Sequence, residues 1–341
     1  MKQMNRKINI LFLLMVLFVA ACSKLNTEGQ ESGRPGLSDP YIFFEAGILD
    51  VTETKANLIT SLPTANGTAF GVIGYYGDGA SIFSAYANGI ARVYREGSLY
   101  KYDNLASWQG TNHTFHAFYP YNGLVVSKND SGTPYVDYTQ PLTEDSMTDI
   151  LGTCQAVTHT ANTKPVQLHF QHLLWAFELS ITNSQTLEVK PDGTTIENPS
   201  ITITKITFTI TDFPKTASLY LNSGYTVTPS TTPITQSYPL YSSTTGDTLT
   251  SGQSKTWGPL LFIPVTGLKY QVTIEYTTPG GIQDRMVYPA EGQYKSVTPE
   301  GGFKRGTRYN LSINKANDKF FEVKGFKPAD WESKNVNHEF N

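Results

Sequence analysis

Large apolar residues recur at every second position in several segments, and this spacing constrains the fold more than any other feature of the sequence. Residues 173–181, 270–276 and 309–313 each place a row of such side chains on one face. Successive side chains of a strand point to opposite faces, so this period is typical of a half-buried strand. No window of useful length shows an apolar stripe at the helical period of 3.6 residues. The chain is therefore predicted to be all-β.

The composition favours the same fold class. The sequence is rich in Thr and contains 20 Tyr, 18 Phe, 28 Gly and 19 Pro, and only 16% of its residues are charged. β-Branched and aromatic residues suit a pleated, half-buried surface, and Gly and Pro suit the turns between strands.

One predicted strand contains a change of phase. In residues 201–210 the apolar positions up to Ile203 have one parity, and those from Ile206 onward have the other. A period of two changes phase only through an extra residue, so we expect a β-bulge near Thr204 and Lys205. Residues 91–103 are predicted to form a hairpin, with Glu96 and Gly97 in the turn.

Two polar stretches indicate how the chain is divided. Residues 183–200 contain Pro, Asp-Gly and Asn-Pro signals and are the best candidate for a linker, whereas residues 230–254 are predicted to be a long loop. The length fits about two domains of ~150 residues. We therefore predict an N-terminal domain over residues 40–183 and a C-terminal domain over residues 184–341.

The N-terminus is predicted to be a lipoprotein signal peptide spanning residues 1–21. Lys2, Arg6 and Lys7 precede a short apolar segment that ends in small residues before Cys22. This order is that of a secretory signal, and the segment is short for a transmembrane helix. The ending resembles the bacterial lipobox, which implies cleavage between Ala21 and Cys22 and acyl chains on Cys22. The alternative is a buried N-terminal helix.

Residues 22–39 are polar, contain Gly and Pro, and are predicted to be a flexible tether. Without the three basic residues of the signal, the chain has 23 Lys+Arg against 29 Asp+Glu, a net charge of −6. This balance argues against a nucleic-acid partner, which requires a concentrated basic face. Lipidation of Cys22 would leave Cys154 alone, so we expect no intramolecular disulfide and domains that depend on their cores.

No arrangement of residues indicates catalysis. His113 with His116, and His169 with His172, have H-x-x-H spacing but lie in predicted strands, where residues three apart point to opposite faces. We therefore expect structural histidines, no metal site and no cofactor. The sequence has no G-x-S-x-G elbow and no phosphate-binding Gly loop. Cys154 is interpreted as a small buried residue, and the chain is not expected to be an enzyme.

Aromatic residues are the remaining candidates for ligand binding. They are Tyr75, Tyr76, Trp108, Tyr119 and Tyr121. They could stack on sugars at a cell surface, or they could fill a β-sandwich core. The core is the favoured interpretation for most of them.

The order of several segments resembles the fimbrillin family, the major and minor subunits of type V pili. The segments are the lipobox at Cys22, TETKA (52–56), FHAFYPY (115–121), DILGT (149–153), LHFQHLLWAFELSI (168–181, with Phe170 and His172), GTRYNLSIN (306–314) and Trp331. The resemblance extends over nearly the whole chain after Cys22. The resemblance implies two tandem transthyretin-like β-sandwich domains of Greek-key type after the signal peptide.

The resemblance also implies a path of maturation. Family precursors are lipoproteins of the outer membrane that a trypsin-like protease cuts after a basic residue following the first strand. In this chain the matching bond lies between Lys55 and Ala56, where the family usually has Arg. The alternative for Lys55 is a solvated turn residue.

Residues 41–51 are apolar on both faces and are predicted to be the first strand, buried in the fold. Removal of this strand is expected to open a groove that the C-terminal strand of the next subunit fills. By resemblance the donor strand would contain Val336 and Phe340. The alternative is that the C-terminal residues complete their own domain. The expected partners are other pilus subunits in a homo- or heteropolymer at the cell surface, the outer membrane before processing, and a host or glycan receptor. A second candidate is a permanently lipidated surface protein, either glycan-binding or a pilus anchor.

Overall fold

The computed structural model describes residues 40–48, 59, 62, 65, 67–160, 164–190, 192–317 and 321–330. These residues form strands and only two short 3₁₀ turns, η2 (Ala87–Gly89) and η3 (Glu144–Ser146). Among them, no helix has the length and apolar character needed to cross a bilayer. The predicted all-β class is confirmed.

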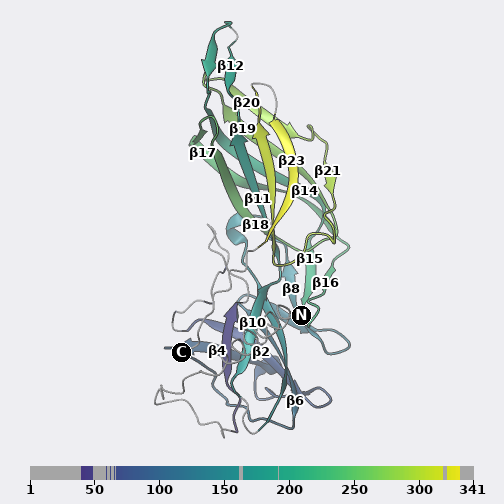
Figure 1. The fold of residues 1–341 in the computed structure, drawn as a ribbon. Helices are drawn as coiled ribbons and strands as arrows, with labels where there is room; N and C mark the ends of the chain where they lie inside the picture. Colours follow the sequence, from purple (N-terminus) through teal and green to yellow (C-terminus); the bar gives the residue numbers. More distant parts are fainter. Residues whose placement is uncertain are drawn as a thin grey trace, which may run out of the picture. The chain divides into compact units, whose positions relative to one another are not determined.

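The N-terminal half is built on one large sheet (Figure 1). Its strands follow the order β1-β10-β9-β6-β2-β4-β5, and β3 pairs with β2. Their bounds are β1 (Phe44–Ile48), β2 (Ala69–Tyr76), β3 (Ala80–Ser81), β4 (Ile90–Glu96), β5 (Leu99–Lys101), β6 (Asn112–Tyr119), β9 (Leu151–Thr158) and β10 (Val166–His172). The sheet curves around an apolar cluster to which β1, β2, β4, β6 and β10 contribute buried side chains.

Two further sheets form a β-sandwich in the C-terminal half. One has the order β18-β11-β22-β23, and the other has the order β17-β14-β19-β20 with β21 paired to β19. Their bounds are β11 (Trp175–Asn183), β14 (Ile201–Pro214), β17 (Pro233–Leu249), β18 (Ser254–Phe262), β19 (Leu268–Thr277), β20 (Gln283–Tyr288), β21 (Lys295–Val297), β22 (Thr307–Lys315) and β23 (Phe321–Asp330).

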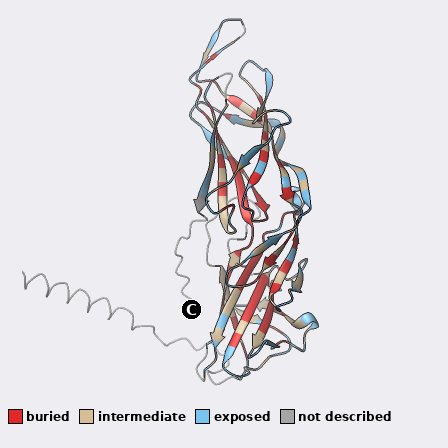
Figure 2. Ribbon diagram, turned by 90° about the vertical axis from the view of Figure 1, so that its right-hand side faces the viewer, coloured by how far each residue is buried: buried red, intermediate tan, exposed pale blue. Residues whose placement is uncertain are grey.

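The alternating apolar rows of the sequence form the core of this sandwich. In β19 and β22 buried residues alternate with more exposed ones along most of each strand, whereas in β11 all residues from Trp175 to Leu179 are buried and the alternation begins only after them. Figure 2 shows buried segments, in red, along the strands of the molecule. The rings of Phe177 in β11 and Phe208 in β14 stack across the two sheets with centroids 3.8 Å apart. The predicted period-two strands are therefore confirmed.

A smaller sheet combines strands from both halves of the chain. Its order is β16-β15-β8-β7, with bounds β7 (Val125–Lys128), β8 (Pro134–Thr139), β15 (Thr216–Tyr220) and β16 (Val227–Pro229). β8 pairs antiparallel with β15 from Tyr135↔Tyr220 to Thr139↔Thr216. Strands from either side of the predicted boundary at residue 183 thus share one hydrogen-bonded ladder, and the domain ranges stay a prediction.

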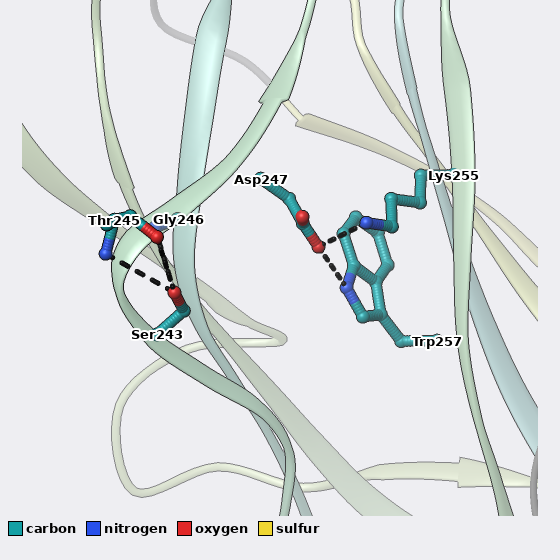
Figure 3. A network of polar contacts seen from close by, with 6 residues as sticks. All are labelled: Ser243, Thr245, Gly246, Asp247, Lys255 and Trp257. Carbon is teal, nitrogen blue, oxygen red and sulfur yellow. Dashed lines mark hydrogen bonds and ion pairs between the residues drawn. The ribbon is translucent and has the colours of Figure 1, made fainter.

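The predicted bulge in β14 is confirmed. The register of β14 with both neighbours shifts between Ile203 and Lys205. In β17 the extra residues form a turn in which the backbone N–H groups of Thr245 and Gly246 point at Ser243 Oγ (Figure 3). Gly246 has φ +72°, and a Cβ there would lie 2.8 Å from the carbonyl oxygen of Ile203. Only glycine fits this approach without strain.

The polar network beside this bulge joins β17 to β18. Asp247 Oδ2 accepts hydrogen bonds from Lys255 Nζ at 2.6 Å and Trp257 Nε1 at 3.0 Å (Figure 3). Burial alone would raise the pKa of Asp247, but these donors outweigh it and hold that pKa below its usual value. The network fixes the end of β17 that follows the bulge.

The prediction of a loop over residues 230–254 is wrong, because β17 occupies most of it. Its Ser and Thr hydroxyls face outward and pair with those of β14, as in Thr209–Ser237 at 2.8 Å and Thr211–Thr235 at 2.7 Å. β17 is an edge strand, which tolerates Pro233 and Pro239.

Two smaller predictions also need correction. The candidate linker at residues 183–200 contains a hairpin of β12 (Leu187–Val189) and β13 (Thr195–Glu197). The predicted hairpin of residues 91–103 is present, but Glu96 pairs with Leu99, so its turn consists of Gly97 and Ser98. Gly97, with φ +63°, supplies the left-handed backbone that the turn requires.

Candidate functional site

The first strand lies at the edge of the N-terminal sheet. β1 pairs in parallel with β10, from Phe44↔Val166 to Ile48↔Phe170. The pairing begins one residue earlier, where Val166 N–H donates to the carbonyl oxygen of Phe43 at 2.8 Å. All other pairs of this sheet are antiparallel.

The residues just before β1 are bound to a different part of the chain. Tyr41 forms a bridge with Ser107, Ile42 N–H donates to the oxygen of Ala106 at 2.9 Å, and Trp108 N–H donates to the oxygen of Pro40 at 2.9 Å. The Tyr102 hydroxyl donates to the oxygen of Ile42 at 2.6 Å. Residues 40–48 therefore close a seam between β10 and residues 102–108, which we call the β1 seam.

The side chains of the strand fill the core beneath this seam. Ile42 is 0% exposed and Phe44 is 3% exposed. The Phe44 ring lies 5.5 Å from the ring of Phe115, 5.7 Å from that of Tyr102 and 6.3 Å from that of Phe83 between centroids. Ala46 and Ile48 pack against the same cluster but are partly exposed. The prediction of a buried first strand is confirmed for Ile42 and Phe44.

A buried polar pair lies beyond the end of β1. His172 Nδ1 is 2.7 Å from Asp149 Oδ2, and their side chains are 5% and 0% exposed. The same carboxylate oxygen accepts a hydrogen bond from Ile59 N–H at 3.1 Å. Asp149 therefore joins the start of the chain after β1 to the end of β10, the strand that β1 pairs with.

This pair was missed in the sequence, although both residues lie in segments that carry the family resemblance. The DILGT segment contains Asp149, and the segment 168–181 contains His172. The signal in the sequence was a carboxylate followed by apolar residues, Asp149 before Ile150 and Leu151, and an imidazole in a predicted strand, His172. Without the register of β9 against β10, nothing in the sequence brings them together.

The other histidines have separate surroundings. His113 Nε2 accepts a hydrogen bond from Gln109 N–H, and its ring packs 4.8 Å from that of Trp108. His116 Nδ1 contacts the carbonyl oxygen of Leu221. Burial lowers the pKa of both imidazoles below the usual value. His169 is partly exposed, on the face of β10 opposite His172, as predicted for residues three apart.

The described residues contain no group of three or more His, Cys, Asp or Glu side chains arranged to hold a metal ion. Cys154 is partly exposed rather than fully buried, and burial raises the pKa of its thiol. The candidate aromatics do not form one platform. Tyr76, Trp108 and Tyr119 pack against the N-terminal core cluster, whereas Tyr121 packs against the other.

The remaining predicted sites lie outside the described residues. These are Ala21 and Cys22 at the signal cleavage site, Lys55 and Ala56 at the processing site, and Val336 and Phe340 in the donor segment. They stay predictions.

The stretch just before the donor segment has a clear place in the fold. β23 pairs antiparallel with β22 over nine positions, from Lys315↔Phe321 to Thr307↔Asp330. Its Phe326 ring lies 5.1 Å from the ring of Tyr270 and 5.6 Å from that of Phe303. For residues 321–330, the alternative that they complete their own domain is confirmed.

Comparison with known proteins connects this fold to one family. The pattern of the family described as Fimbrillin-like matches residues 54–325. No curated protein matches the chain. Among solved structures, a fimbrial protein from Bacteroides vulgatus ATCC 8482 aligns with 15% identity and a TM-score of 0.53, over 86% of this chain and 100% of that chain.

Two other solved structures align over a similar length. A candidate cell adhesion protein from Bacteroides uniformis ATCC 8492 has 18% identity and a TM-score of 0.49, over 88% of this chain and 100% of that chain. The fimbrial anchor protein Mfa2 from Porphyromonas gingivalis has 11% identity and a TM-score of 0.41, over 85% and 97%. Because the family pattern matches well over half of the sequence, the chain belongs to the fimbrillin-like family.

Proposed function

We propose that this protein is a pilus subunit that is exported as a lipoprotein and assembled by strand exchange. Cys22 carries the lipid after cleavage at Ala21, and a protease later cuts between Lys55 and Ala56. The cut releases residues 40–48 together with the anchor. A strand from another subunit then takes their place and contributes to an adhesive fimbria at the cell surface.

The β1 seam is the observation that supports this proposal. Residues 40–48 are bound on both sides by backbone hydrogen bonds and bury Ile42 and Phe44. Their loss would expose unpaired N–H and C=O groups on β10 and residues 102–108, together with an apolar trough. A single extended donor strand satisfies both edges and refills the trough, which is the physical basis of strand addition.

The anchored pair of Asp149 and His172 suits this role. Ile59 follows the proposed cut and donates to Asp149, which contacts β10 through His172. The new N-terminal region would thus stay fixed beside the open seam after the first strand has left.

Limited digestion tests the processing step. A trypsin-like protease acting on the folded full chain should give a new N-terminus at Ala56 and a large resistant product, because exposed polar segments are the preferred sites of cleavage. Cutting at Arg34 with Lys55 intact would contradict the proposal. The N-terminus of the surface form gives the same answer in cells: Ala56 for a polymerised subunit, or Cys22 for a permanently lipidated binding protein.

Two variants test the ends of this pathway. Cys22→Ser should abolish lipidation and remove the protein from the membrane fraction. Deletion of residues 335–341 should leave a folded monomer that no longer donates a strand. If the truncated and cut protein still donates to its partner subunits, Val336 and Phe340 are not the donor.

A further inference from the structure

The β1 seam sets a definite requirement on any strand that fills it. The two fully buried positions of the seam, Ile42 and Phe44, are two residues apart and therefore face the core together. The second position is a pocket of aromatic rings contributed by Phe83, Tyr102 and Phe115. A fitting strand must carry two large apolar side chains two residues apart, and one of them must fill the aromatic pocket.

Residues 331–341 of this chain do not meet that requirement. After β23 ends at Asp330, the sequence is WESKNVNHEFN. Its large apolar residues are Trp331, Val336 and Phe340, and no two of them are two positions apart. Within residues 331–341, in either strand direction and in every register, at most one of the two buried positions would receive a large apolar side chain.

The neighbouring strand β23 is not an alternative source. Phe321 and Val323 have the required spacing, but both lie in the nine-position ladder with β22. Phe326 of the same strand belongs to the ring cluster of the C-terminal core. If β23 left its own domain to fill the seam of another subunit, the core of its own β-sandwich would be exposed.

We propose that the β1 seam is built for a strand from a different kind of pilus subunit, and that a second copy of this chain is a poor donor. The preferred donor is an extended segment with a large aliphatic and an aromatic residue two positions apart. The C-terminal segment of this chain would then enter a seam of different shape. This inference rests on the proposed strand exchange and narrows it to a heterotypic contact.

Peptides added to the full-length protein test this specificity. The protein is cut at Lys55 in the presence of a labelled peptide at a series of concentrations. The amount of peptide bound to the cut protein is measured at each concentration and gives the affinity of that peptide. One peptide repeats residues 40–48 and one repeats residues 331–341. A third carries His338→Phe, which places apolar residues at 336, 338 and 340. The matched control carries Asn337→Phe, which adds the same ring out of phase.

We expect the first and third peptides to bind, and the second and the control to bind about 100-fold more weakly, as expected when one of the two buried positions is not filled by a large apolar side chain. Binding of the unaltered 331–341 peptide within about 10-fold of the 40–48 peptide would overturn the heterotypic inference alone. Equal weakness of the His338→Phe peptide and its control would also overturn it. If the 40–48 peptide itself fails to bind the cut protein, the seam does not open and the proposed strand exchange falls as well.

Discussion

The strands β1 and β23 both complete a sheet at its edge, but the structure holds them in different ways. β1 pairs in parallel over five positions, and the residues before it turn to a second partner segment. β23 pairs antiparallel with one neighbour over nine positions. Parallel pairing is slightly less stable per residue than antiparallel pairing. The backbone of β1 is therefore the weaker ladder, and its attachment depends more on side chains.

The burial of side chains shows the opposite difference, because β1 has more deeply buried side chains than β23. Phe44 is 3% exposed and has aromatic rings on several sides, whereas Phe321, Val323 and Phe326 of β23 are only partly buried. A strand with a short ladder and deeply buried anchors can be exchanged for another strand with the same anchors. A strand with a long ladder and shallow anchors is better suited to stay in place.

Truncation of one aromatic ring in each strand tests this difference between β1 and β23 most directly. Phe44→Ala should lower the free energy of unfolding by about 4 kcal/mol, as for other buried Phe residues. Phe326→Ala should cost about 2 kcal/mol, because its ring is partly exposed and its strand is held by the longer ladder. Urea denaturation of both variants measures the difference. Equal losses would mean that the two strands are anchored alike.

The sequence predicted many of these strands, but it did not predict which strands pair with each other. The alternation in residues 270–276 and 309–313 predicted strands because one face of each is buried and the other is more exposed. The phase change near Thr204 predicted the bulge for the same reason. The apolar row in residues 173–181 also predicted a strand, although β11 is buried on both faces over residues 175–179. The apolar character of residues 41–51 predicted a buried first strand, of which the structure describes residues 41–48.

Prediction from the sequence failed for features that depend on contacts between segments distant in the chain. β17 resembled a loop because it is rich in Ser and Thr, and several of these side chains find partners among Thr side chains of β14, from which they are separated by 24 to 46 residues in sequence. The role of residues 102–108 as the second edge of the seam depends on backbone contacts that carry no sequence signal. Asp149 and His172 both lie in segments that carry the family resemblance, but the sequence does not indicate that they are in contact.

The next effect concerns the polar pair that follows β1. Asp149→Ala removes the acceptor that the Ile59 N–H and the His172 imidazole share, and should lower the free energy of unfolding by about 3 kcal/mol. Asp149→Asn keeps an acceptor oxygen and should cost less. Hydrogen exchange should show the loss in β1 and β10 and spare β22 and β23. Uniform loss of protection in all four strands would contradict a local role.

A smaller change separates the two edges of the β1 seam. Tyr102→Phe retains the ring beside Phe44 but removes the hydroxyl that donates to the Ile42 oxygen, so the free energy of unfolding should fall by about 1 kcal/mol. The same variant should release residues 40–48 more readily after cleavage at Lys55. Tyr100→Phe is a matched control, because its ring contacts Phe70 in the same sheet and lies outside the seam. Equal release from both variants would show that the hydroxyl does not hold the strand.

The smallest expected effect is a dependence of stability on pH that is confined to the sheet that contains β1. Burial lowers the pKa of His113 and His116, and both lie in β6, in the same sheet as β1. The unfolded chain binds protons at these histidines near pH 6.5, whereas the folded chain resists protonation until the pH falls further. The unfolded state therefore binds more protons in this window, and stability should decrease as the pH falls below about 6.5. The described part of β22 and β23 contains no histidine, so amide protection corrected for intrinsic exchange should decrease in β1, β6 and β10 and stay nearly constant in β22. His116→Gln should weaken this dependence, and a decrease of equal size in all of these strands would show that the two buried histidines are not its source.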